Sequence, residues 1–173
     1  TITGAKLVEV GTQKGTTAEQ LERAIGPRTA AVHYFYPWEP TPGPLPLQEV
    51  VRIAHSKGVP VIVDAAGQVF PLDHMRSFTK VGADLVCFGA KYFGGPHSAG
   101  VLCGKRELVE SAALQGFIGF EETNSASFGR PMKVDRQEIV GTVVALQEWF
   151  SMNHEDRLMA LDSRVRRIMT ALQ

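Results

Sequence analysis

The stretch DLVCFGAKYFGGPHSAGVLCG, residues 84–104, contains two apolar runs with a single lysine between them. The interpretation of the fold depends on this stretch. The first run, 84–88, has the character of a buried strand and ends in two small residues, Gly89 and Ala90. Lys91 comes next, and a glycine pair and a proline precede the second apolar run, 99–103. We interpret both runs as strands and the lysine as a side chain carried to the end of the first one.

Strand-like and helix-like segments alternate in the sequence before this stretch. Helical patterns at 17–25, at 47–56 and around 73–80 are separated by apolar runs of strand character. Such alternation indicates an α/β fold, a three-layer and mostly parallel sheet of about five strands with helices on both faces, followed by C-terminal helices. The carboxyl ends of parallel strands meet at one edge, where ligands bind in such sheets. We expect strands near 6–10, 29–35, 59–64, 84–88 and 99–103.

The chain divides into three parts by composition. Residues 1–115 hold the alternating segments and their last amphipathic helix. Residues 116–134 are rich in glycine and polar side chains and are expected to form a connecting loop. Residues 135–173 are expected to be helical, since Asp135 and Glu138 have the spacing of a capping box and apolar residues recur at helical intervals after them.

Composition and charge exclude several classes of function. Eighteen basic residues balance eighteen acidic ones, so neither a nucleic-acid partner nor an anionic membrane surface is expected. No apolar segment approaches the ~18 residues of a membrane span. Cys87 and Cys103 lie in apolar runs and are interpreted as reduced core thiols rather than as a disulfide or a metal pair. We therefore expect a cytoplasmic protein without a metal site.

Two charged residues follow apolar strands at the expected ligand edge. Asp64 closes the run VPVIVD, and Lys91 lies 27 residues later, three positions beyond the next strand. A lysine amine can form a Schiff base with an aldehyde cofactor, and a carboxylate can keep a pyridine nitrogen protonated. Pyridoxal 5'-phosphate needs both groups. Each residue alone has an ordinary alternative, a turn or cap for Asp64 and a solvated surface position for Lys91.

Three further runs carry a family resemblance: VIVDAAGQ (61–68), GADLVCFGAKYFGGPHSAGVLCGK (82–105) and GRPMKVDRQEIVGTVVALQEWF (129–150), with the opening AKLVEVGTQKGTT in support. The sequence resembles pyridoxal-phosphate enzymes of fold type I, the aspartate aminotransferase-like group. The branch it is most similar to contains selenocysteine synthase and D-glucosaminate-6-phosphate ammonia-lyase. The resemblance implies that Lys91 bonds to the cofactor, that Asp64 holds the pyridine nitrogen, and that the last strand runs antiparallel to the others.

The resemblance also implies further site residues. Gln68 would approach the ring oxygen of the cofactor, although it follows Asp64 by one residue more than in many related enzymes. His97 and Ser98 would lie at the rim of the site, near the substrate. Arg130 would hold a carboxylate or phosphate, the alternative being a surface arginine before a helix.

Two departures limit these expectations. Phe88 and Ala90 stand where many relatives have polar groups that help to hold the phosphate or the substrate. We therefore expect the site geometry to be present and the cofactor to be weakly bound or absent. The chain is also shorter than enzymes of this fold type, so it resembles the central part of a large domain, residues 1–115, leading through 116–134 and 135–173 toward a small domain that is cut short.

Two hypotheses about function follow. In the first, the chain is or derives from a pyridoxal-phosphate-dependent lyase or transferase that acts on an amino acid or amino sugar acid, with α-proton abstraction and β-elimination. In the second, it is a truncated, non-catalytic α/β module that keeps an oligomeric or binding role. Both predict a homo-oligomer, because missing strands would leave sheet edges and apolar helix faces uncovered.

Overall fold

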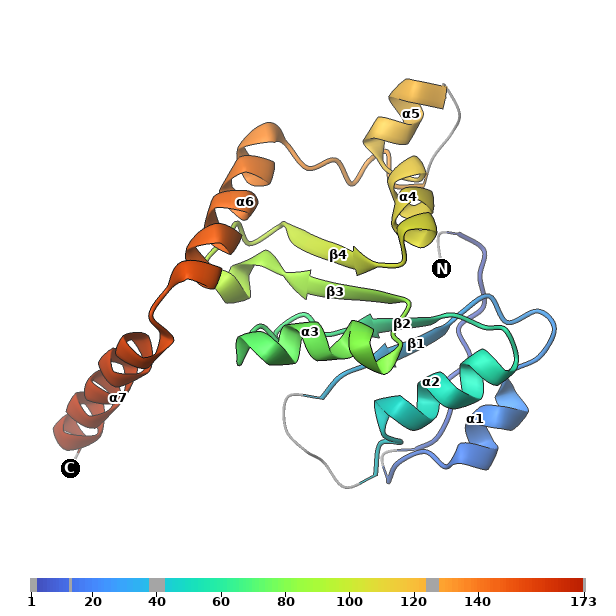
Figure 1. Cartoon of the computed structure of the whole chain (residues 1–173), viewed down its shortest axis with the longest axis horizontal. Helices are drawn as coiled ribbons and strands as arrows, with labels where there is room; N and C mark the ends of the chain where they lie inside the picture. The colour runs from blue at the N-terminus through green and yellow to red at the C-terminus, as the bar shows by residue number, and fades with distance from the viewer. Residues whose placement is uncertain (1–2, 13, 38–42, 124–127, 173) are drawn as a thin grey trace.

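The structure is a computed structural model that describes residues 3–12, 14–37, 43–123 and 128–172. Helices and strands alternate in the first part of the chain, and helices alone follow (Figure 1). In chain order the elements are α1 (Ala18–Ala24), β1 (Val32–Phe35), α2 (Leu47–Ser56), β2 (Val61–Asp64), α3 (Leu72–Val81), β3 (Leu85–Gly89), the 3-10 helix η1 (Ala90–Phe93), β4 (Gly100–Gly104), α4 (Arg106–Leu114), α5 (Phe117–Thr123), α6 (Arg136–Ser151) and α7 (His154–Ala171).

The four strands form one sheet in the order β1-β2-β3-β4. The first three are parallel, and Val63 of β2 lies level with Tyr34 of β1 and Val86 of β3. Helices α2 and α3 supply the crossovers that parallel neighbours require. β4 returns antiparallel because only residues 90–99 join it to β3, too few for a crossover. The α/β class, the mostly parallel sheet and the reversed last strand are confirmed.

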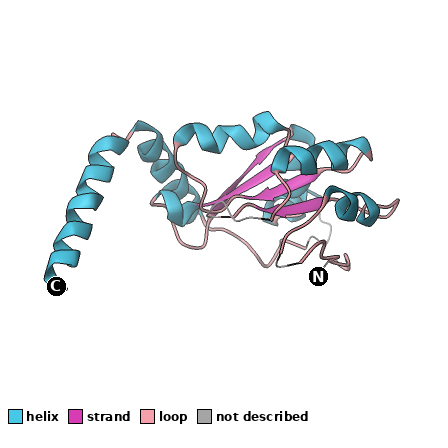
Figure 2. Ribbon diagram, turned by 90° about the horizontal axis from the view of Figure 1, so that it is seen from below, coloured by secondary structure: helices cyan, strands magenta, loops and turns pink. Residues whose placement is uncertain are grey.

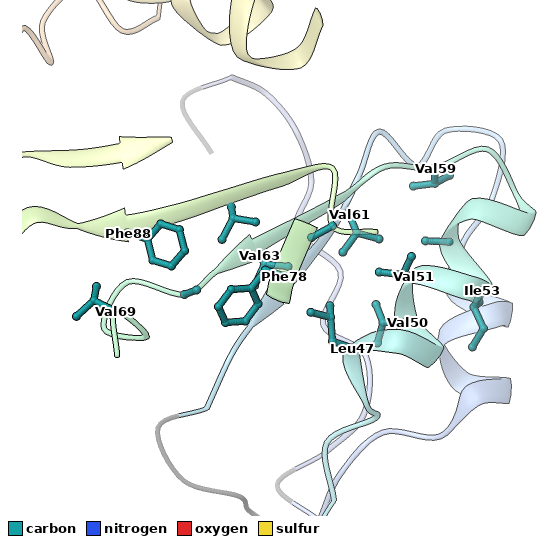
Figure 3. Close-up of a cluster of buried hydrophobic side chains, with 14 of the residues drawn as sticks. Leu47, Val50, Val51, Ile53, Val59, Val61, Val63, Val69, Phe78 and Phe88 are labelled. Atoms are coloured by element: carbon teal, nitrogen blue, oxygen red, sulfur yellow. The ribbon is translucent and has the colours of Figure 1, made fainter. Parts of the chain in front are cut away.

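One face of the sheet forms the hydrophobic core with α2 and α3 (Figure 3). Val61, Val63 and Val86 point to this face and are 0% exposed. Leu47 of α2 and Phe78 of α3 belong to the same buried cluster. Burying each such side chain contributes about 1.5–3 kcal/mol. This face therefore fixes how the helices lie on the strands.

The opposite face carries a row of side chains that crosses the whole sheet. The register places Phe35 beside Asp64, Asp64 beside Cys87, and Cys87 beside Leu102. Because successive strand residues alternate between faces, this row points away from core residues such as Val63. Phe35 is 59% exposed and Leu102 is 38% exposed. We call these four residues the open row, since the described part of the chain leaves its two apolar ends in solvent.

The prediction of a strand over 6–10 is wrong. Residues 3–12 contain no strand, and Leu7 and Val8 are 71% and 60% exposed. A strand needs a neighbour that supplies its hydrogen-bond partners, and no described segment does so here. The sheet of the described residues therefore has four strands instead of about five. The expected connection over 116–134 also contains a helix, α5.

The C-terminal helices lie at the end of the sheet where β3 finishes. α6 packs against η1, and its N-terminus carries the predicted capping box of Asp135 and Glu138. α7 projects away from the sheet (Figure 1 and Figure 2), and none of its side chains is buried. Within the described residues, no helix is both long enough and apolar enough to span a membrane.

Candidate functional site

Asp64 is the charged member of the open row and the last residue of β2. Its side chain is half-buried, with Phe35 and Cys87 on its two sides. The Asp64 Oδ1 atom accepts a hydrogen bond from the amide of Ala66 at 3.1 Å. This bond ties the carboxylate to the turn that follows the strand. An acceptor held in this way can keep a proton on a basic nitrogen of a ligand.

Lys91 lies in η1, directly beyond β3, and its side chain is exposed. The amine Nζ is 5.0 Å from the centre of the Tyr92 ring. An exposed amine at the end of a rigid strand can be reached by an aldehyde or a carbonyl compound. Such an amine can form an imine when it is unprotonated.

Backbone hydrogen bonds hold the ends of β2 and β3 side by side. The amide of Ala65 donates to the carbonyl of Cys87 at 3.1 Å, and the amide of Gly89 donates to the carbonyl of Ala66 at 2.9 Å. The turn after Asp64 is thus joined directly to the residues that precede Lys91. Asp64 and Lys91 therefore belong to one edge of the sheet, at the ends of neighbouring parallel strands.

Cys87 was interpreted from the sequence as a core thiol, and its place in the open row was missed. Its Sγ donates a weak hydrogen bond to the Val63 carbonyl at 3.4 Å. Burial, followed by the negative charge of Asp64, raises the pKa of the Cys87 thiol. Cys103 points to the core face, since it lies level with Val86, so the two cysteines are on opposite sides of the sheet. Only the strand register gives this information.

Gln68 lies in the same turn region as Asp64. Its amide Nε2 donates to the carbonyl of Pro37 at 3.1 Å, and its backbone amide donates to the Ala65 carbonyl at 2.8 Å. The side chain therefore connects the segment after β2 with the segment after β1. This places Gln68 at the ligand edge, bound to the protein backbone.

His97 and Ser98 lie in the turn between η1 and β4, and both are exposed. The Ser98 hydroxyl donates to the Glu138 carboxylate of α6. Close by, a Cβ atom on Gly141 of α6 would lie 3.2 Å from the ring of Pro96. The turn that carries His97 and Ser98 is therefore held by α6.

Arg130 lies apart from these residues. Its guanidinium is 4.9 Å from the Phe117 ring and 4.6 Å from the Phe120 ring, both on α5. α5 packs against α4, which follows the carboxyl end of β4 (Figure 1). Because β4 is antiparallel, that end lies with the amino ends of the parallel strands. The structure does not bring Arg130 together with Lys91.

A second polar cluster, which the sequence did not indicate, lies at the amino ends of β2 and β3. Asp84 is 1% exposed, and its carboxylate lies 2.8 Å from His55 Nε2 and 2.6 Å from Lys105 Nζ. It also accepts a hydrogen bond from the Val61 amide at 2.7 Å. Asp84, His55 and Lys105 line a pocket of about 330 Å³ with Glu107 and other residues. The cluster joins four elements and lies at the opposite edge from Lys91.

Comparisons with known proteins identify related chains. A family model described as "Aminotransferase class-V" matches residues 2–152. The chain is 34% identical over 157 residues to a 5'-C-glycyluridine monooxygenase-decarboxylase from Streptomyces sp, covering 89% of this chain and 36% of that one. It is 32% identical over 148 residues to a D-glucosaminate-6-phosphate ammonia lyase from Salmonella typhimurium, covering 84% and 36%.

A third relative is an L-seryl-tRNA(Sec) selenium transferase from Rhizobium meliloti, 34% identical over 158 residues, with 83% of this chain and 31% of the relative covered. Among solved structures, a D-glucosaminate-6-phosphate ammonia-lyase superposes with a TM-score of 0.73 at 30% identity, covering 87% of this chain and 37% of that one. The chain thus spans about a third of the length of the relatives it matches.

Proposed function

Because the chain belongs to the aminotransferase class-V family, we propose that it forms part of a pyridoxal-phosphate-dependent lyase or transferase acting on an amino acid or amino sugar acid. The observation that carries the proposal is the joining of Asp64 and Lys91 at one sheet edge. Their strands are parallel neighbours, and the Gly89–Ala66 hydrogen bond links the segments that hold them. The two relatives named as an ammonia lyase and a selenium transferase support the two reaction classes.

The residues present fit this cofactor at its aldehyde and at its ring nitrogen. Pyridoxal phosphate, when bound, supplies an aldehyde for attachment and a protonated ring that takes up electrons from the substrate. Lys91 would provide the amine for attachment and later carry the α-proton of the substrate on Nζ. Asp64 would hold the proton on the ring nitrogen. Loss of a hydroxyl or phosphorylated group from the β-carbon is the elimination that we propose.

Three further residues belong to the proposal by their positions. Gln68 lies in the turn after Asp64 and would approach the ring oxygen once released from the Pro37 carbonyl. His97 and Ser98 share the connection that begins with Lys91 and would line the rim on the substrate side. Arg130 is outside the proposal, because its guanidinium packs on the aromatic rings of α5.

The alternative, a non-catalytic oligomeric or binding module, is favoured by one specific feature. The exposed ends of the open row, Phe35 and Leu102, present apolar surface on the face of the sheet opposite the core. A second copy of the chain, or a partner, would cover this surface in such a module. Asp64 and Lys91 would then have no role in catalysis.

Cofactor labelling separates the two functions. Purified protein would be incubated with pyridoxal phosphate and reduced with borohydride, and the modified lysine would be found by peptide mapping. The proposal predicts labelling at Lys91, its loss in Lys91→Ala, and normal labelling of Lys91 in the control Lys80→Ala, which removes an exposed lysine of α3. Labelling mainly at another lysine, or no preference among lysines, would remove the enzyme assignment.

A further inference from the structure

Tyr92 follows Lys91 in η1, and its ring lies beside the lysine amine. The separation of 5.0 Å between Nζ and the ring centre is inside the ~6 Å range of a cation–π contact. Lys91 is exposed, whereas Tyr92 is partly buried. The ring is therefore the better anchored of the two partners. A lysine stem has large rotamer freedom, so a fixed ring beside the amine restricts where the amine lies.

Gly89 explains how the ring reaches this position. A Cβ atom on Gly89 would lie 3.1 and 3.2 Å from two carbons of the Tyr92 ring. The φ angle of Gly89 is −82°, so the glycine contributes space and not an unusual backbone conformation. The same residue donates its amide to Ala66, whose own amide donates to the Asp64 carboxylate. A series of contacts therefore leads from the Asp64 carboxylate through Ala66 and Gly89 to the Tyr92 ring. The ring in turn contacts the Lys91 amine.

We propose that Tyr92 is a positioning residue for Lys91: its ring, packed on Gly89, holds the lysine amine at the edge of the sheet that also carries Asp64. The inference rests on the proposed function, in which the Lys91 amine bonds to the cofactor aldehyde. The ring acts through its face, so phenylalanine would replace tyrosine and leucine would not. The expected gain is a larger fraction of time in which the amine lies where a cofactor aldehyde can meet it.

The contact itself can be measured without cofactor. Reductive methylation with ¹³C-formaldehyde keeps the lysine charge and gives one methyl signal for each lysine. The Lys91 signal is assigned as the one missing in Lys91→Arg. We expect its proton shift to lie upfield of the other exposed lysines in the wild type and in Tyr92→Phe, because the methyl groups lie over a ring. In Tyr92→Leu the shift should return to the range of exposed lysines.

Two more variants keep this test specific. Gly89→Ala retains the Tyr92 ring but places a methyl group against it, so the upfield shift should shrink. Phe128→Leu removes an exposed ring elsewhere in the chain and should leave the Lys91 signal unchanged. Circular dichroism spectra and melting temperatures that match the wild type show that each variant is folded. A wild-type Lys91 signal inside the range of exposed lysines, or one unaffected by Tyr92→Leu, overturns the inference.

The kinetic consequence is tested with pyridoxal phosphate itself. An imine forms from the neutral amine, so the kinetic effect comes from the ring restricting the lysine stem and not from the charge contact. We expect borohydride-trapped labelling of Lys91 to slow by about two- to fivefold in Tyr92→Leu, because the stem regains part of its rotamer freedom, and to be unchanged in Tyr92→Phe. Equal rates in all three proteins overturn the positioning role even if the ring contact is observed. Absence of Lys91 labelling in every protein instead refutes the proposed function, while the methyl shift still reports on the contact.

Discussion

Asp84 is the only charged side chain that is buried among the described residues. Its partners His55, Val61 and Lys105 come from α2, from β2 and from the end of β4. A buried carboxylate is tolerated because these groups satisfy its oxygens. The sheet, α2 and the start of α4 are joined at this one residue. Asp84 is thus a structural centre at the edge opposite the candidate site.

Asp84→Asn should lower the free energy of unfolding by about 1.5–3 kcal/mol, the range for hydrogen bonds to charged groups. The amide keeps the shape of the carboxylate but loses its charge toward Lys105 and His55. Urea denaturation followed by circular dichroism measures the change. The matched control is Glu110→Gln, which removes an exposed carboxylate paired with Arg106 and should change stability by less than about 0.5 kcal/mol. Equal effects of the two substitutions would contradict the structural role.

The same residue predicts how stability depends on pH. Burial by itself raises the pKa of Asp84, but hydrogen bonds from Lys105, His55 and the Val61 amide together hold this pKa below its ordinary value. The unfolded chain therefore takes up the proton at a higher pH than the folded chain. The contribution of Asp84 is complete above the unfolded pKa of about 3.9 and is lost as the pH falls through the lower folded pKa.

We expect the free energy of unfolding to decrease between about pH 5 and about pH 3 more steeply in the wild type than in Asp84→Asn. Other carboxylates with a lowered pKa, such as Glu49, are present in both proteins. The difference between the two curves therefore isolates Asp84. Parallel curves over this range would show that the carboxylate has the same proton affinity in the folded and unfolded chain.

The sequence predicted the positions of Asp64 and Lys91 better than the positions of their neighbours. The shared edge of Asp64 and Lys91 could be expected because each follows an apolar run, and parallel strands end at one edge. Cys87 and Tyr92 were missed for a different reason. Their relation to Asp64 and Lys91 depends on strand register and on the close approach that Gly89 permits. Neither quantity can be read from local composition.

Among the elements, α6 holds the segment that carries Lys91. The Trp149 indole donates to the Val69 carbonyl at 2.9 Å, Gly141 lies close to Pro96, and Glu138 accepts from Ser98. These contacts are spread over the length of the helix. α6 therefore connects the turn after η1 with the segment after β2.

Trp149→Phe should destabilise the fold by about 1–3 kcal/mol, because it removes the donor to a buried carbonyl while keeping most of the apolar ring. Thermal and urea unfolding would measure the loss. Val143→Thr is the control on the same helix, since Val143 is 51% exposed, and it should stay within about 0.5 kcal/mol of the wild type. A loss no larger than that of the control would mean that the indole hydrogen bond contributes little.

Most of the helices follow from signals that are local in the sequence, with α5 as the exception. The helix that follows Thr17, the capping box at Asp135 and the helix Leu47–Ser56 are set by residues close in sequence, and the structure has them where the patterns indicated. The apolar run over 6–10 looked the same as a true strand. It lacks a neighbour among the described segments, and no local pattern reports a missing neighbour.

At the scale of the whole molecule, two surfaces have no cover within the described residues. One is the apolar part of the open row, Phe35 and Leu102, and the other is α7, where no side chain is buried. Charge does not oppose association, because acidic and basic residues are equal in number. The relatives are about three times as long as the part matched here. We expect a second copy of the chain to cover these surfaces.

We predict that the 173-residue chain sediments as a dimer or larger species at micromolar concentration. The double substitution of Phe35→Thr and Leu102→Thr should shift it toward the monomer, because burial of these two side chains against a second copy would contribute about 25 cal/mol for each Å² of apolar surface removed from water. Leu114→Thr on α4, 48% exposed in the wild type, is the control and should leave the distribution unchanged. Sedimentation velocity over a concentration series measures the outcome. A wild-type chain that remains monomeric over the series would show that neither the open row nor α7 binds a second copy.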